Sequence, residues 1–217
     1  MGWMLSMNNF NDPIIRQLGL ISYTKVLSMM HQFTHFRKNV KMKDEIWLVQ
    51  HPPVFTQGKS SKKNIPSDII GIPCIKTDRG GKITYHGPGQ QILYFMLDLR
   101  YRKINLSTLV RLLETIAIHT LHHFGIPGYR CSGLPGVYIN KKKICSIGLR
   151  IKYGCSLHGL SINISMDITP FLYINPCGTN MFVTQMSHFI PHISIDEVLP
   201  ILISNCISLL REESNNK

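Results

Sequence analysis

The sequence is poor in acidic residues and has no patterned cysteines. Only 12 Asp and Glu stand against 24 Lys and Arg, which gives a net charge of +12 at pH 7. The six cysteines include no C-x-x-C pair, so neither a disulfide scaffold nor a zinc ribbon is expected. No apolar stretch approaches the roughly 18 residues of a membrane span, and the N-terminus has no signal-peptide pattern. We therefore expect a cytoplasmic protein.

The composition is that of a folded protein, with 217 residues, 44% hydrophobic residues and 17% charged residues. We expect one domain over residues 1–217, with a core at about 20–210 and mobile segments at 59–64 and 212–217. The positive charge favours an acidic partner, which could be nucleic acid, a membrane surface or an acidic protein. A general enrichment in Ile, Lys and Asn explains the charge equally well.

Hydrophobic periodicity predicts three helices, at 23–38, at 107–123 and from Ser194 onwards. Asn105 or Ser107 caps the second helix and Gly125 ends it, whereas Ser194 and Glu197 form a capping box for the third. Eight runs are typical of strands: 45–50, 54–56, 72–76, 83–85, 91–97, 137–139, 143–151 and 156–163. Because helices and strands do not alternate regularly, we predict an α+β fold with mixed or antiparallel sheets packed against helices.

A glycine-rich run is the densest candidate for a binding site. Its sequence is Arg79-Gly80-Gly81-Lys82-Ile83-Thr84-Tyr85-His86-Gly87-Pro88-Gly89-Gln90. Such a backbone bends twice around a short strand and leaves room for a ligand, although two ordinary tight turns would need the same residues. The run does not match the phosphate-binding glycine motifs, so a nucleotide site gains no support.

Two cysteines are candidate nucleophiles. Cys177 lies on a turn between a proline and a glycine, and its thiol needs a nearby cation to react at neutral pH. Lys143 ends a lysine run, and strand alternation places it on the same face as Cys145, which is therefore a rival nucleophile. His86 and His158, beside glycines, are the histidine candidates, and no His/Cys cluster has the spacing of a metal site.

The order and spacing of several sequence segments resemble those of the octanoyltransferases of lipoate biosynthesis. These enzymes are octanoyl-acyl-carrier-protein:protein N-octanoyltransferases. The resemblance covers residues 45–180, and the matching segments are 51–56 with Gly58, 79–90, 135–138, 143–150, 158–160 and 175–178. It implies an α+β catalytic domain related to those of lipoate and biotin protein ligases. One departure is Ser161-Ile162, where Ala-Leu is common in the family.

The resemblance also implies a mechanism and a site. Cys177 takes the octanoyl group from the carrier protein as a thioester and yields it to a lysine of a lipoyl domain, and Lys143 lowers the pKa of Cys177 and transfers protons. The residues implied to line the acyl site are Arg79, Gly80, Gly81, Lys82, Ile83, Thr84, Tyr85, His86, Ser146, Ile147, Gly148, Gly159, Leu160 and Ser161. No metal or cofactor is implied.

The implied partners are octanoyl-acyl carrier protein as donor, and lipoyl domains of 2-oxoacid dehydrogenases and glycine cleavage H protein as acceptors. These partners are acidic, which accounts for the basic charge, and a monomer that binds neither nucleic acid nor membrane is expected. Two alternatives remain open. One is an ATP-dependent lipoate or biotin ligase, whose H-D-x-G-N-like signature differs from the sequence at 86–90. The other is a non-enzymatic basic binding protein.

Overall fold

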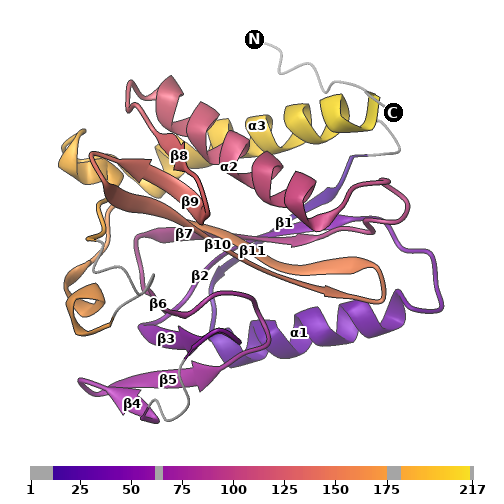
Figure 1. Cartoon of the computed structure of the whole chain (residues 1–217), viewed down its shortest axis with the longest axis horizontal. Helices are drawn as coiled ribbons and strands as arrows, with labels where there is room; N and C mark the ends of the chain where they lie inside the picture. The colour runs from indigo at the N-terminus through magenta and orange to yellow at the C-terminus, as the bar shows by residue number, and fades with distance from the viewer. Residues whose placement is uncertain (1–11, 62–65, 175–181, 216–217) are drawn as a thin grey trace.

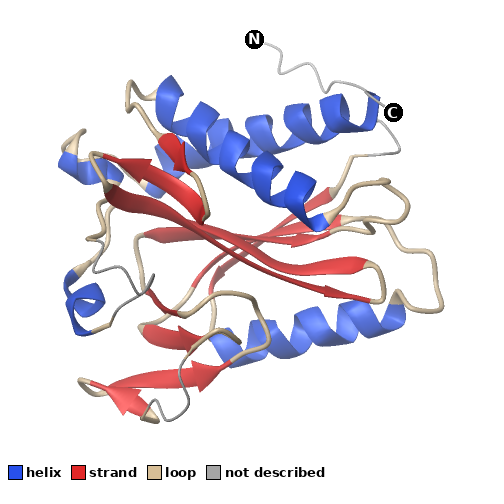
Figure 2. Cartoon of the chain, viewed as in Figure 1, coloured by secondary structure: helices blue, strands red, loops and turns tan. Residues whose placement is uncertain are grey.

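The computed structural model describes residues 12–61, 66–174 and 182–215, and in this part of the chain helices cover both faces of a large sheet (Figures 1 and 2). Helix α1 (Tyr23–Phe36) lies on one face, whereas α2 (Leu106–His123) and α3 (Ile195–Asn215) lie on the other. Two short 3-10 helices are η1 (Thr169–Tyr173) and η2 (Met186–His188). None of the described helices combines the length and apolarity needed to cross a membrane.

Two sheets organise the strands. The order in the large sheet is β1 (Ile14–Leu20), β2 (Glu45–Gln50), β7 (Gln90–Met96), β11 (Cys155–Asn163), β10 (Lys142–Lys152), β9 (Leu134–Ile139) and β8 (Tyr129–Cys131). The order in the small sheet is β4 (Asp68–Ile69), β5 (Ile72–Lys76), β3 (Val54–Gln57) and β6 (Ile83–His86). The pairs β1–β2 and β3–β5 are parallel and the other neighbours are antiparallel. The predicted α+β class with mixed sheets is confirmed.

Apolar side chains of the helices pack against both faces of the large sheet. On α2, Leu109, Leu113 and Ile116 are buried in the larger core cluster, at the three- and four-residue spacing that the sequence predicts. On the other face, Val26 and Met30 of α1 pack in a second cluster with side chains of β2 and β7. The large sheet is therefore held from both sides, and its strands form a rigid base for the site.

The predicted helix ends are also observed. The Asn105 side chain accepts a hydrogen bond from the Thr108 amide at 2.9 Å, and Gly125 has a φ of +71°. The Ser194 amide donates to the Glu197 carboxylate at 2.9 Å, as a capping box requires. Helix α3 continues to Asn215, so the predicted tail from residue 212 is helical up to that point.

Every predicted β-rich run coincides with an observed strand, but β1, β4 and β8 were not predicted. Strand β1 is largely exposed, so it has no apolar alternation, and it pairs with β2 at the sheet edge. Its Arg16 donates to Glu45 across that pair at 2.6 Å. Strands β4 and β8 have only two and three residues. Such strands are defined by their partners rather than by their own sequence.

Candidate active site

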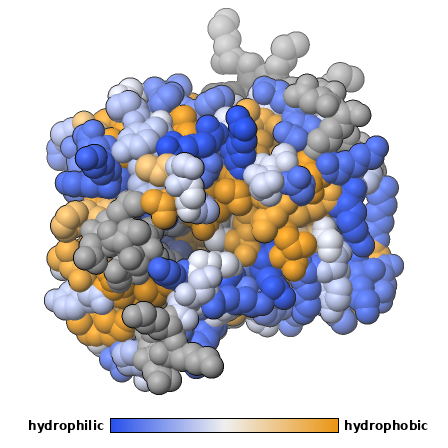
Figure 3. Space-filling model, viewed as in Figure 1, coloured by the Kyte–Doolittle hydropathy of each residue, from blue (hydrophilic) through white to orange (hydrophobic). Residues whose placement is uncertain are grey.

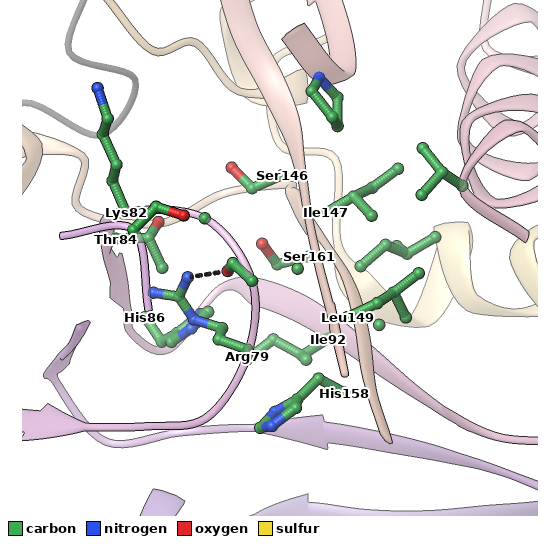
Figure 4. Close-up of a pocket in the computed structure, with 18 of the residues that line it drawn as sticks. Arg79, Lys82, Thr84, His86, Ile92, Ser146, Ile147, Leu149, His158 and Ser161 are labelled. Atoms are coloured by element: carbon green, nitrogen blue, oxygen red, sulfur yellow. Dashed lines mark hydrogen bonds between the residues drawn. The ribbon is translucent and has the colours of Figure 1, made fainter. Parts of the chain in front are cut away.

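A pocket of about 350 Å³ lies where the small sheet and the following loop approach β10 and β11 (Figure 4). Every residue that the resemblance assigned to the acyl site lines this pocket except Tyr85. Lys143 lines it as well. Tyr85 alternates with Thr84 and His86 along β6, and its ring packs instead against Phe55 and Phe171, at centroid distances of 5.3 and 5.5 Å.

Two segments that are distant in sequence form one wall of the pocket. In the antiparallel pair β10–β11, Ser146 lies opposite Ser161, Ile147 opposite Leu160, and Gly148 opposite Gly159. The glycines allow close packing on both sides of this wall. A Cβ atom on Gly159 would lie 2.0 Å from the Leu93 carbonyl oxygen, and one on Gly148 would lie 3.1 Å from Arg79 Cδ.

Substituting Gly159 by alanine is expected to destabilise the fold by about 1–3 kcal/mol, because the new methyl group meets rigid backbone. Gly148→Ala is the matched control and should cost less, since its new Cβ atom would lie 3.1 Å from its nearest neighbour and not 2.0 Å. Urea denaturation of both variants measures the difference. Equal losses in the two variants would contradict the role assigned to the Leu93 contact.

Arg79 fixes the loop that covers the pocket. Its buried guanidinium donates to the Thr56 carbonyl oxygen at 2.6 Å, to Thr56 Oγ1 at 2.8 Å and to the Gly80 carbonyl oxygen at 3.0 Å. The Gly80 amide in turn donates to the Leu149 carbonyl oxygen of β10 at 2.8 Å. Burial lowers the pKa of Arg79, but an arginine remains charged at neutral pH. The side chain therefore positions the loop between the two sheets.

His86 belongs to a chain of buried hydrogen bonds behind the pocket. Its Nδ1 lies 2.7 Å from Gln90 Oε1, which can only accept, so Nδ1 carries the proton. Gln90 donates to Asn163 Oδ1 at 2.9 Å, and Asn163 donates to the Thr184 carbonyl oxygen at 2.9 Å. Burial lowers the pKa of His86 to about 3, so the ring is neutral, and its Nε2 faces Thr56 Oγ1 at 3.4 Å.

Asp78 joins helix α1 to β11 beside the pocket. Its carboxylate lies 2.8 Å from His158 Nε2 and 3.4 Å from His31 Nε2. The hydrogen bond from His158 holds the pKa of Asp78 well below its usual range. Burial lowers the pKa of His158, whereas the bond to Asp78 raises it, and the effect of burial is the larger of the two. Since His158 has a positive φ of 63°, this contact also holds a strained position of β11 in place.

Lowering the pH is expected to destabilise the fold through His51. Its Nδ1 donates to the Ile21 carbonyl oxygen at 2.6 Å, its Nε2 accepts from the Tyr94 hydroxyl at 2.8 Å, and burial lowers its pKa to about 4. The unfolded chain, with a His pKa near 6.5, then binds a proton that the folded chain does not. The free energy of unfolding therefore falls by up to about 1.4 kcal/mol per pH unit between pH 6.5 and 4 through this group.

Urea denaturation at pH 7, 6 and 5 measures this slope. His51→Gln should have a shallower slope than the wild type, and His119→Gln, at an exposed position of α2, should keep the wild-type slope. A His51→Gln variant with the wild-type slope would show that another group is responsible.

Lys143 lies at the pocket over the ring of Tyr138, with Nζ 5.4 Å from the ring centroid. Gly136 makes this position possible, because a Cβ atom there would lie 2.6 Å from Lys143 Cε. The Lys143 amide donates to the Phe182 carbonyl oxygen at 2.9 Å. The segment that begins at Phe182 is therefore paired to the strand that carries the lysine.

Cys145 does not line the pocket as Lys143 does. The register between β9 and β10 shifts between these two residues, so the predicted strict alternation is interrupted, and both Ile144 and Cys145 pack in the larger core cluster. Cys145 is fully buried, does not line the pocket, and has a pKa raised to about 12 by burial. These properties are those of an inert core thiol. Cys177, the predicted nucleophile, lies outside the described residues.

The resemblance implies only part of the apolar side of the pocket, such as Ile147. Leu106 and Val110 of α2 and Leu134 of β9 also line it. A signal was present in the sequence, because Leu106 and Val110 form an apolar row beside the core row of Leu109 and Leu113. Among the described residues, no group of three or more His, Cys, Asp or Glu side chains could hold a metal ion.

The chain belongs to the family of the lipoyl protein ligase A/B catalytic domain, whose model matches residues 22–207. Among solved structures, a bipartite lipoate protein ligase of Thermoplasma acidophilum aligns with a TM-score of 0.70, 18% identity and coverage of 95% of this chain and 93% of that one. A lipoate-protein ligase A bound with ATP also has a TM-score of 0.70, with 16% identity and coverage of 95% of both chains. At these identities the likeness establishes the fold alone.

Relatives at much higher identity are octanoyltransferases. The octanoyltransferase of Sodalis glossinidius is 49% identical over 199 residues, covering 91% of this chain and 90% of that protein. The octanoyltransferase of Klebsiella pneumoniae subsp. pneumoniae is 50% identical over 204 residues, covering 92% and 94%. The resemblance stated from the motifs is thus confirmed, and the enzyme is an acyltransferase of protein lipoylation.

Proposed function

We propose that the enzyme transfers an octanoyl group from octanoyl-acyl carrier protein to the ε-amine of a lipoyl-domain lysine, through a thioester on Cys177. The observation that carries this proposal is the pocket itself, which combines a lysine, buried polar groups and an apolar wall in a cavity of about 350 Å³. Lys143 lies on the pocket, and its backbone is bonded to Phe182, five residues after Cys177 in sequence.

In the first step, the Cys177 thiolate attacks the carbonyl carbon of the octanoyl thioester. The tetrahedral intermediate collapses with release of the carrier's thiolate, which takes a proton from the Lys143 ammonium. In the second step, the amine of the lipoyl-domain lysine attacks the acyl-enzyme, an amide forms, and the Cys177 thiolate leaves. The proton lost by the attacking amine returns to Lys143. The two steps together need no nucleotide, because Lys143 recovers in the second step the proton that it donates in the first.

A hydroxyl at the polar end of the pocket supports this chemistry. Thr84 is buried and lines the pocket, and its Oγ1 has no hydrogen-bond partner within the described ranges (Figure 4). A buried hydroxyl that makes no hydrogen bond destabilises the folded protein unless a bound ligand supplies the missing hydrogen-bond partner. Here the bound substrate would supply that partner, because its acyl carbonyl oxygen would accept a hydrogen bond from the Thr84 hydroxyl.

The partners follow from the same proposal. The Thermoplasma acidophilum structure is described as a lipoate protein ligase with its E2 lipoyl domain, which supports a lipoyl domain as acceptor. We extend this to the lipoyl domains of 2-oxoacid dehydrogenases and to glycine cleavage H protein. The net charge of +12 suits an acidic carrier protein as donor, and turnover should then weaken strongly as salt concentration rises.

Intact mass spectrometry after mixing with octanoyl-acyl carrier protein tests the covalent step. The wild type and Cys145→Ser should each gain one octanoyl group that hydroxylamine removes, and Cys177→Ser should gain none. An adduct that disappears only in Cys145→Ser would overturn the choice of nucleophile. If no form is acylated, the transfer proposal fails, and ATP-dependent ligation of free octanoate should be assayed next.

A further inference from the structure

The side of the pocket formed by α2 is apolar and lies opposite the polar side. Figure 4 shows Ile147 and Leu149 of β10 pointing toward one side of the pocket, whereas Arg79, Lys82 and Thr84 lie on the other. The α2 residues that join the apolar side are Leu106 and Val110, which are four residues apart and so project from neighbouring turns of the helix. The pocket therefore has a polar end for a reacting carbonyl and an apolar end for a hydrocarbon chain.

The apolar end reaches the surface of the molecule. Leu106 is 47% exposed although it lines the pocket, and Val110 is half-buried. In the space-filling view, apolar side chains gather right of the central hollow, on the face that carries the beginning of α2 (Figure 3). An exposed large apolar residue at the edge of a pocket is typical of a surface that a ligand covers.

We propose that Leu106 and Val110 contact the distal methylenes of the acyl chain, and that the open end makes the enzyme discriminate against short chains but not against longer ones. This inference rests on the proposed function. A short chain loses contacts with α2, and each methylene removed from an apolar contact lowers kcat/KM by up to about fourfold. A longer chain meets no wall, because its end emerges beside Leu106.

The experiment is a series of acyl-carrier proteins loaded with butanoyl, hexanoyl, octanoyl, decanoyl and dodecanoyl groups, with a lipoyl domain as acceptor. For the wild type, kcat/KM should rise steeply from butanoyl to octanoyl and then stay within about threefold up to dodecanoyl. In the double variant Leu106→Ala/Val110→Ala, the ratio of kcat/KM for octanoyl to that for hexanoyl should become at least threefold smaller than in the wild type, whatever the change in absolute rate. His119→Ala, at an exposed position that does not line the pocket, should reproduce the wild-type series.

A bulky variant provides an independent measurement. Val110→Phe narrows the apolar end, so the ratio of kcat/KM for octanoyl to that for butanoyl should fall at least tenfold, and a wild-type urea denaturation midpoint shows that the variant is folded. A wild-type kcat/KM that drops more than tenfold between octanoyl and decanoyl would overturn the proposal that the apolar end of the pocket is open. A chain-length series that is identical in all variants would overturn the role of α2. A wild type that transfers none of the acyl groups would instead refute the proposed function.

Discussion

Replacing Lys143 by methionine is expected to lower kcat/KM for octanoyl transfer by about 10²- to 10⁴-fold, the range for loss of a general acid and base. Lys143 lines the pocket, on a strand position whose backbone amide donates to the Phe182 carbonyl oxygen, five residues after Cys177. In the proposed mechanism, removing it takes away both the charge that favours the thiolate and the group that exchanges protons with the leaving thiolate and the attacking amine. Methionine is unbranched and extends as far as Cε, the lysine atom that packs against Gly136, so it removes the ammonium while keeping that contact.

Two measurements separate this role from a structural one. The rate of Cys177 alkylation by iodoacetamide should rise at higher pH in Lys143→Met than in the wild type, because the thiolate loses its cation. Lys142→Met is the matched control, since Lys142 is the exposed neighbour on the same strand, and it should keep the wild-type rate and alkylation profile. An unchanged alkylation profile together with full activity in Lys143→Met would refute the assignment.

Replacing Asp44 by alanine is expected to lower the free energy of unfolding by about 3–5 kcal/mol, the cost of breaking a buried ion pair. Its carboxylate accepts from Arg37 and Arg102, whose side chains are only 2% and 5% exposed. It also accepts from the Asp98 amide at 2.8 Å. Without Asp44, two guanidinium groups remain buried side by side with no carboxylate between them. The variant is therefore expected to unfold at much lower urea concentration.

Asp98→Asn is the matched control for this experiment. Asp98 pairs with Arg100, whose side chain is 58% exposed, so removing the charge should cost less than about 1 kcal/mol. Asparagine keeps the oxygen that accepts from the Arg100 and Tyr101 amides. Urea denaturation of the two variants at the same pH gives the comparison. Losses of equal size would show that burial of the Asp44 pairs contributes little.

The sequence predicted those parts of the molecule that are encoded locally. The spacing of Leu109, Leu113 and Ile116 predicts helix α2. The capping residues Asn105 and Ser194 predict the beginnings of α2 and α3, which the structure confirms. The glycine-rich run at 79–90 is recognisable from the sequence alone as a candidate binding segment, and its residues 79–84 and 86 line the pocket. Periodicity and turn chemistry are properties of short windows, so they can be read without the fold.

Features that depend on pairing between distant segments could not be predicted. The interruption at Ile144 arises from the register of β9 against β10, and it separates Cys145 from the pocket although alternation placed it beside Lys143. Strand β1 forms only because β2 offers an edge about 30 residues later. Leu106 and Val110 read as ordinary helix residues until the position of α2 over β10 is known. In each case the deciding contact is absent from the local sequence.

The chain of buried hydrogen bonds through His86 has a consequence for motion. It links Arg79 and Thr56 in and beside the small sheet to Gln90 and Asn163 in the large one. Separating one sheet from the other would leave several buried polar groups without hydrogen bonds at once, so we expect local opening here to be rare. Amide hydrogen exchange in β6, β7 and β11 should therefore proceed through global unfolding, and these strands should form one cooperative unit.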